Sequence, residues 1–121
     1  MAVKAIFFYC LTLGLPIAAQ PVPNPLDKID FPLTAIDPDG LIGSATGKRS
    51  QAYEFCLPAG EKAAVQAIDP SLQFSQSPGR VKCQAGQLLA IGETHQPQWR
   101  SILINLARLP YVEQIAPHWA E

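Results

Sequence analysis

The residues best suited to chemistry in this 121-residue chain are its three cysteines and two histidines. Cys10 lies in an apolar N-terminal stretch, and Cys56 and Cys83 lack the C-x-x-C spacing of a redox or zinc motif. His95 and His118 are distant from both in sequence, so no metal site is expected. Cys56 and Cys83 are instead expected to form one structural disulfide, because disulfides persist in exported proteins.

Two short motifs resemble ligand-binding loops, and both lack essential residues. The sequence at 37–40, Asp-Pro-Asp-Gly, begins like a calcium loop but has no distal glutamate. Gly47 and Lys48 resemble the end of a phosphate-binding loop, yet Arg49 stands where a hydroxyl is needed. The serines and histidines show no spacing typical of a nucleophile elbow or a catalytic triad. The sequence therefore predicts a non-enzymatic protein without a cofactor.

Composition limits the size of the protein and the kind of partner. The length allows one small domain. Nine basic and ten acidic residues leave a formal net charge of −1, and the basic residues are scattered. Because no positive field would attract phosphates, nucleic acid is not an expected partner.

The first nineteen residues have the pattern of a secretory signal peptide. Lys4 precedes a short apolar run from Ala5 to Ile17, and the small residues Ala18 and Ala19 follow. The run is too short to cross a membrane as a helix. We expect cleavage before Gln20 and export to the periplasm or the extracellular space. The chain would associate with a membrane only if residues 1–19 remain uncleaved as an anchor.

The remaining chain is expected to form a linker and a small domain. Residues 20–50 are rich in proline and glycine, which disfavour regular helices, so a linker is predicted there. Residues 51–121 show the periodicity of an α+β domain. The predicted elements are a strand at 52–57, a helix at 60–68, strands at 72–75 and 87–92, a helix at 97–109, and a strand at 111–116. Thr94 or Gln96 would cap the second helix, and Trp99 would face the core.

This order, β-α-β-β-α-β, predicts a ferredoxin-like antiparallel sheet with both helices on one face. The first and third strands would lie side by side in the centre, and we expect them to be parallel. That direction would place Cys56 far from the start of the third strand. The disulfide would then require the third strand to begin near Arg80, with Gly86 as a bulge.

Residues 102–117 end a helix with Leu-Pro and continue as Val-x-x-Ile-Ala-Pro. This segment resembles the closing segment of subtilisin propeptides, the peptidase-inhibitor I9 family, whose fold has the same element order. The matching residues are Pro110, Val112, Ile115 and Pro117. Ala116 stands where the family has glutamate.

The resemblance implies a protein partner. Members of the family cover the substrate-binding face of a subtilisin-like serine protease, and their C-terminal tail enters its active-site cleft as an extended strand. Here the tail would include Pro117, His118 and Trp119. Because no protease follows Glu121 in this sequence, a stand-alone inhibitor or chaperone is expected. The alternative is an exported domain with an unspecified envelope or small-molecule-binding role.

Overall fold

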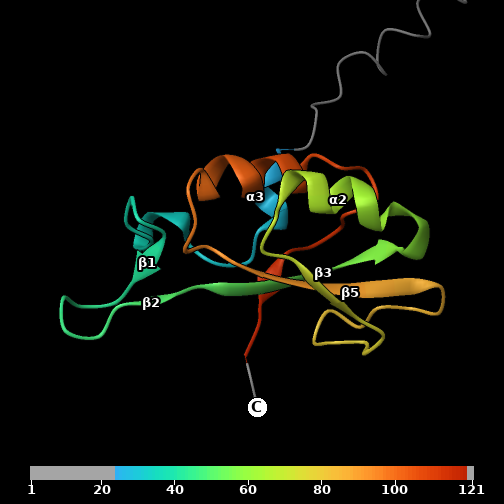
Figure 1. Cartoon of the computed structure of the whole chain (residues 1–121), viewed down its shortest axis with the longest axis horizontal. Helices are drawn as coiled ribbons and strands as arrows, with labels where there is room; N and C mark the ends of the chain where they lie inside the picture. The colour runs from blue at the N-terminus through green and yellow to red at the C-terminus, as the bar shows by residue number, and fades with distance from the viewer. Residues whose placement is uncertain (1–23, 120–121) are drawn as a thin grey trace, which may run out of the picture.

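The computed structural model describes residues 24–119, which form a mixed α+β structure with two α-helices and two antiparallel sheets (Figure 1). The expected signal peptide, residues 1–19, and its cleavage site lie outside the described residues. Within residues 24–119, no helix is both long enough and apolar enough to cross a membrane.

The main sheet contains four strands in the order β4-β5-β3-β6, and every neighbouring pair is antiparallel. The strands are β3 (Ala52–Pro58), β4 (Gln73–Ser75), β5 (Gln87–Glu93) and β6 (Ala116–Pro117). The central strands β3 and β5 pair along their whole length, from Ala52 opposite Glu93 to Pro58 opposite Gln87. These strands are adjacent as expected, but the predicted parallel direction is wrong.

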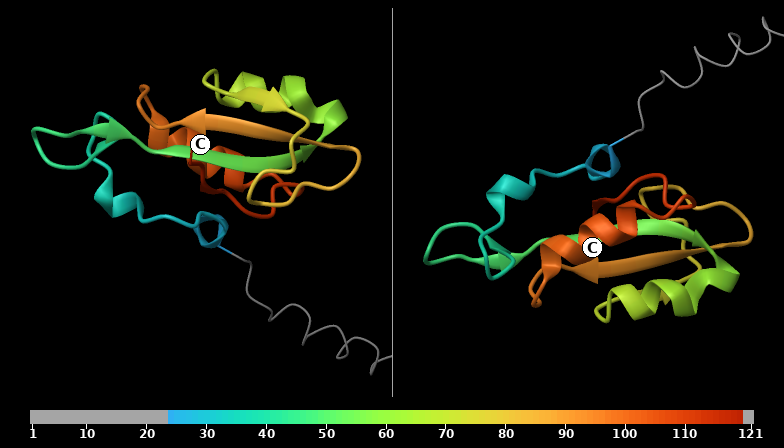
Figure 2. Two further views of the ribbon diagram at one scale, coloured as in Figure 1. Left: turned by 90° about the horizontal axis from the view of Figure 1, so that it is seen from below. Right: turned by 90° about the horizontal axis from the view of Figure 1, so that it is seen from above.

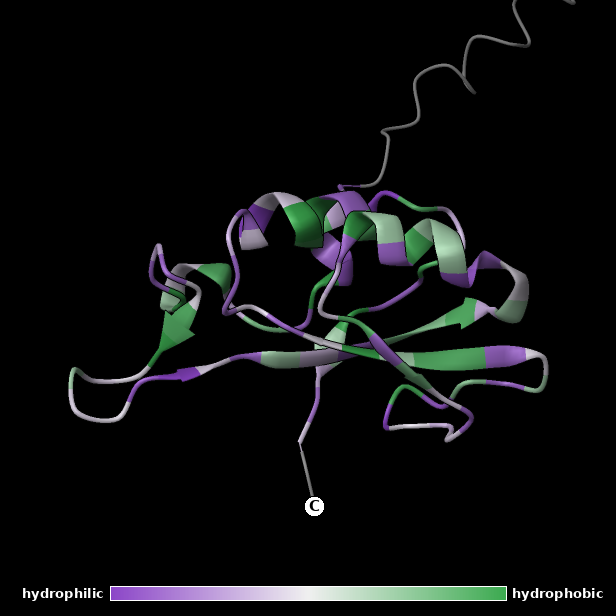
Figure 3. Ribbon diagram, in the orientation of Figure 1, coloured by the Kyte–Doolittle hydropathy of each residue, from purple (hydrophilic) through white to green (hydrophobic). Residues whose placement is uncertain are grey.

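Both α-helices lie on one face of this sheet (Figure 1; Figure 2). A short 3-10 helix, η4 (Ala59–Glu61), leads into α2 (Lys62–Ile68), and α3 (Trp99–Ala107) follows β5. Hydrophobic residues run along β3, β5 and both helices (Figure 3). The buried residues of α3 are Trp99, Ile102, Leu103, Leu106 and Ala107. They pack against Tyr53, Phe55 and Leu57, which alternate along β3 and have no exposed surface.

The helix α3 begins without the expected side-chain cap. Gln98 precedes it in the left-handed conformation, with φ +62°, and makes no capping hydrogen bond. Thr94 is buried instead: its hydroxyl donates to Gly40 O at 2.6 Å and accepts from Gln51 N at 2.9 Å. The Gln96 side chain donates to Asp69 Oδ1 at 3.0 Å. The cap prediction is wrong because tertiary partners engage both side chains.

The last strand is shorter than predicted. Residues 111–115 form a turn and an extended segment, and only Ala116–Pro117 is a strand. Val112 and Ile115 both have no exposed surface. Residues three apart lie on opposite faces of a regular strand, so burying both on one core excludes a strand across them.

The described part of the predicted linker packs against the domain. Residues 24–50 contain η2 (Pro25–Lys28), η3 (Leu33–Ala35), and the hairpin strands β1 (Leu41–Ile42) and β2 (Arg49–Ser50). Ile29, Phe31 and Ile36 belong to the core, and Ile29 forms a parallel bridge with Ile115. Proline prevents long helices here, but the apolar residues between the prolines still bury their side chains.

A buried carboxylate ties α2 to β3. Asp69 follows α2 and has no exposed surface. Its Oδ1 accepts hydrogen bonds from Ser71 N and Gln96 Nε2, each at 3.0 Å, and its Oδ2 accepts from the Tyr53 hydroxyl. These donors satisfy a carboxylate that would otherwise be costly to bury.

This network predicts a loss of stability at alkaline pH. Burial raises the pKa of the Tyr53 hydroxyl, and the neighbouring Asp69 carboxylate raises it further. Because the folded-state pKa exceeds the unfolded-state value, the stabilisation is complete below about pH 10 and is lost as the pH rises above that value. Urea denaturation between about pH 9 and pH 11.5 should show this loss, and Tyr53→Phe should reduce the pH dependence. Tyr111→Phe, at a half-buried residue whose pKa is also raised by burial, is the control, and an equal reduction there would contradict the assignment.

Candidate functional site

The candidate site lies on the sheet face opposite the helices. On β3, Glu54 and Cys56 alternate with the core residues and therefore point to this outer face. Glu54 is nevertheless only 1% exposed. The loop between β4 and β5, residues 76–86, lies over this side of the sheet and accounts for its burial (Figure 1).

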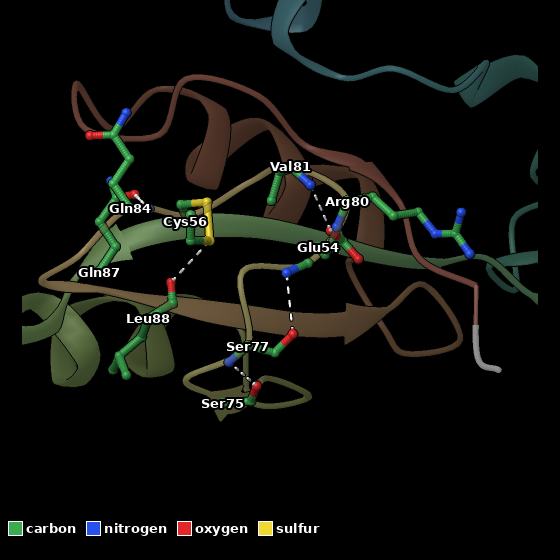
Figure 4. The surroundings of a disulfide bond; sticks show 11 residues. Glu54, Cys56, Ser75, Ser77, Arg80, Val81, Gln84, Gln87 and Leu88 are labelled. Atoms are coloured by element: carbon green, nitrogen blue, oxygen red, sulfur yellow. Dashed lines mark hydrogen bonds between the residues drawn. A yellow bond between two sulfur atoms is a disulfide. The ribbon is translucent and has the colours of Figure 1, made fainter.

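The disulfide ties this loop to the sheet. Cys56 and Cys83 are bonded, with their Cα atoms 5.4 Å apart, as the sequence predicted (Figure 4). The predicted early start of the third strand is wrong: β5 begins at Gln87, and Gly86 has φ +85° in a turn rather than a bulge. Since β3 and β5 are antiparallel, the end of β3 already lies beside the start of β5. Cys83 therefore reaches Cys56 from the loop without a longer strand.

Glu54 binds the same loop through hydrogen bonds. Its Oε2 accepts from Arg80 N at 2.7 Å and from Val81 N at 3.0 Å (Figure 4). Gly79 permits this approach, because a Cβ there would lie 2.6 Å from Oε2 and 2.6 Å from a methyl carbon of Leu89. Gly79 also has φ +65°, a conformation that glycine adopts readily. The loop backbone thus closes directly over the carboxylate.

The other oxygen of Glu54 binds the expected tail, Pro117–Trp119. His118 Nδ1 donates to Glu54 Oε1 at 2.8 Å, an ion pair whenever the imidazole is protonated. The His118 backbone N donates to Ala52 O at 2.9 Å, and Pro117 pairs with Tyr53 in the sheet. The structure therefore brings His118 to Glu54 and Pro117 to the neighbouring residue Tyr53.

A small pocket lies between the tail and the loop. Its volume is about 210 Å³, and Leu89 and Ile91 form part of its apolar wall. Glu54, His118 and Trp119 also line it. Trp119 is 50% exposed, and the only other exposed large hydrophobic residue among residues 24–119 is Leu26, at 36%.

The second histidine lies elsewhere. His95 is exposed, and its Nδ1 is 3.0 Å from Asp39 O. Across the part of the chain that the structure describes, no three His, Cys, Asp or Glu side chains are grouped as a metal site would require.

Sequence reasoning missed Glu54, the central residue of this site. A signal was present, because a charged residue between Tyr53 and Phe55 in an alternating strand must lie on the face opposite the core. The pattern could not show that a distant loop would cover that face.

The site is built to hold two chain segments together. One oxygen of Glu54 binds the loop and the other binds the tail. Ser75 and Ser77 also line the pocket, but their hydroxyl oxygens accept hydrogen bonds from Ser77 N and Gly79 N within the turn. The carboxylate is therefore best described as an anchor. No protein-family model, curated protein or solved structure matches this chain.

Proposed function

We propose that this chain is a small exported, non-enzymatic interaction domain whose tail, Pro117–Trp119, engages a protein partner. The observation that carries the proposal is the half-exposed Trp119 directly after a residue anchored on both backbone and side chain. Covering the exposed part of Trp119 with a partner would be favourable, because it removes apolar surface from water. Tryptophan is also enriched among residues that dominate binding energy at interfaces. The tail thus combines a fixed direction with an apolar contact group.

Two features of the chain favour export. Residues 1–19 have the order of a secretory signal peptide. The Cys56–Cys83 disulfide requires an oxidising environment, and such bonds are rare in the cytosol. The periplasm and the extracellular space both provide this environment.

A ferredoxin-like fold is part of the proposal. The order β4-β5-β3-β6 places the third and first strands of the domain in the centre, with antiparallel neighbours. Both helices connect strands across the same face (Figure 2). These features support the arrangement expected from the order β-α-β-β-α-β.

The proposed partner is a subtilisin-like serine protease, which this chain would inhibit or help to fold. The resemblance of residues 102–117 to the I9 propeptide family supports this choice, and its apolar positions Val112 and Ile115 are both buried. Pro117 lies in a strand, so the residues that follow it continue from an extended backbone. An extended segment is the form in which peptides add to the edge of a partner's sheet.

Titration of purified residues 20–121 against subtilisin-like proteases tests the function. We expect inhibition at micromolar concentration or below, and a loss of about 30-fold in affinity for Trp119→Ala, the scale of an interface hot spot. Leu26→Ala is the matched control, because it removes the other exposed large hydrophobic residue. The proposal is wrong if no inhibition occurs and the protease degrades the chain as an ordinary substrate.

The second candidate function is binding of a small molecule in an envelope or extracellular role. The pocket between Glu54 and Trp119 favours it, because apolar residues and a carboxylate line the same cavity. Its volume of about 210 Å³ lies below the range of about 300–1,000 Å³ typical of ligand sites. The interaction domain is therefore the better-supported function.

A further inference from the structure

We infer that the Cys56–Cys83 disulfide switches the tail between an anchored and a released form. In the oxidised chain the disulfide holds residues 76–86 over Glu54, and the covered carboxylate holds His118. This inference rests on the proposed function, because it assigns redox control to the tail that would bind the partner.

The disulfide is the covalent link between this loop and the sheet. Residues 76–86 contain no helix or strand, and Lys82, Gln84 and Ala85 are exposed. Gly79 and Lys82 are both left-handed, and Lys82, with φ +59°, is a residue type that disfavours this conformation. The loop forms hydrogen bonds within its own turns, such as Cys83 N to Pro78 O, and these leave its position over the sheet to its contacts with β3. The disulfide restrains that position covalently.

The disulfide and the carboxylate tie the same two segments together. Glu54 and Cys56 lie on the same face of β3, and their partners Val81 and Cys83 have the same spacing in the loop. The covalent bond therefore keeps the Arg80 and Val81 amides within reach of Glu54 Oε2 (Figure 4). Breaking it would let both amides leave together.

Uncovering Glu54 would weaken its bond to the tail. In the closed form the carboxylate is 1% exposed, so water does not compete for Oε1. In the open form the carboxylate would be hydrated, and an exposed pair of this kind contributes little. Without its side-chain anchor, His118 would open its backbone hydrogen bond to Ala52 O more often. The direction of Trp119 would no longer be fixed.

A reductant can approach the bond from solvent. Both cysteines are half-buried, and Cys83 lines an open cavity of about 420 Å³. A thiolate of a small dithiol would attack one sulfur, breaking the Cys56–Cys83 bond, forming a mixed disulfide and releasing the other cysteine as a thiolate. The second thiolate of the reagent would then attack the mixed disulfide and release the remaining cysteine. Two electrons and two protons pass to the protein, and the reagent leaves as a disulfide. Oxidation by a disulfide reagent reverses each step.

Hydrogen exchange of the full chain with and without dithiothreitol tests the switch. We expect reduction to accelerate exchange at least tenfold at the amides of Arg80, Val81 and His118. The amide of Leu103, in the core of α3, should stay protected. If exchange accelerates at the amides of Arg80 and Val81 but not at that of His118, the loop and the tail are not coupled through Glu54. If exchange at the Leu103 amide accelerates equally, the disulfide stabilises the whole fold and does not act as a switch for the tail.

A substitution at Glu54 tests the relay with the disulfide intact. Glu54→Leu removes both acceptors at similar length, and it should accelerate exchange at Val81 and His118 in the oxidised protein. Glu54→Gln is the matched control, because its oxygen can still accept from the loop amides and they should remain protected. Unchanged His118 exchange in Glu54→Leu would overturn the inference. None of these measurements involves a protease, so a failed titration would reject the partner while leaving the coupling measurable.

Discussion

Replacing Leu106 with alanine is expected to destabilise the domain by about 2–5 kcal/mol. Leu106 has no exposed surface and lies in the core cluster between α3 and the sheet. Its truncation loses the transfer energy of the side chain and leaves a cavity in closely packed surroundings. Domains of this kind are stable by only about 5–15 kcal/mol, so the loss is a large fraction of the total. Urea denaturation followed by circular dichroism measures it.

The matched control is Leu26→Ala, which makes the same chemical change at the surface. Leu26 is 36% exposed and lies in η2, outside the buried core cluster. Its truncation should change the free energy of unfolding by less than about 1 kcal/mol. An effect at Leu106 as small as that at Leu26 would show that the packed face of α3 is misassigned.

Local sequence patterns predicted most of the elements because each lies between clear breaks. The aromatic residues of 52–57 form β3, and the apolar run at 87–92 forms most of β5. The predicted helix at 60–68 corresponds to η4 followed by α2. The observed helix α2 ends at Ile68, as the predicted helix does. The spacing of apolar residues after Pro97 predicted which face of α3 is buried. In each case the residues that determine the element are neighbours in the sequence.

The relative direction of β3 and β5 was predicted wrongly, although the connections between the strands determine this direction. A strand that follows a helical crossover returns parallel to the strand before it, so β4 runs parallel to β3. The irregular loop of residues 76–86 then reverses the chain, so β5 runs antiparallel to both. The same reversal brings Cys83 close to Cys56.

The disulfide was predicted from residue type and the tail from a family resemblance, but the link between them was not predicted. Cys56 and Cys83 were paired because they are the two cysteines after the expected signal peptide. The link is Glu54, whose partners are the backbone amides of Arg80 and Val81. Every residue except proline carries such an amide, so no sequence pattern marks these two as donors. Only the path of the loop selects them.

Substitution of Gly40 with alanine is expected to cost about 3–5 kcal/mol, because two penalties act at one position. Gly40 has φ +81°, a left-handed conformation that disfavours any residue with a Cβ. A Cβ there would also lie 1.9 Å from Thr94 O. That oxygen belongs to the backbone of a buried residue whose hydroxyl donates to Gly40 O, so it cannot move aside independently.

Gly86→Ala separates the two penalties, since Gly86 has φ +85° but a Cβ there would meet no atom within 4 Å. It should cost only the conformational part, about 1–2 kcal/mol. The difference between the two variants therefore measures the close approach of residue 40 to Thr94. That contact joins the hairpin region before β3 to the end of β5. Equal losses in urea denaturation would mean that this approach is loose in solution and that residues 37–42 are not fixed against the sheet.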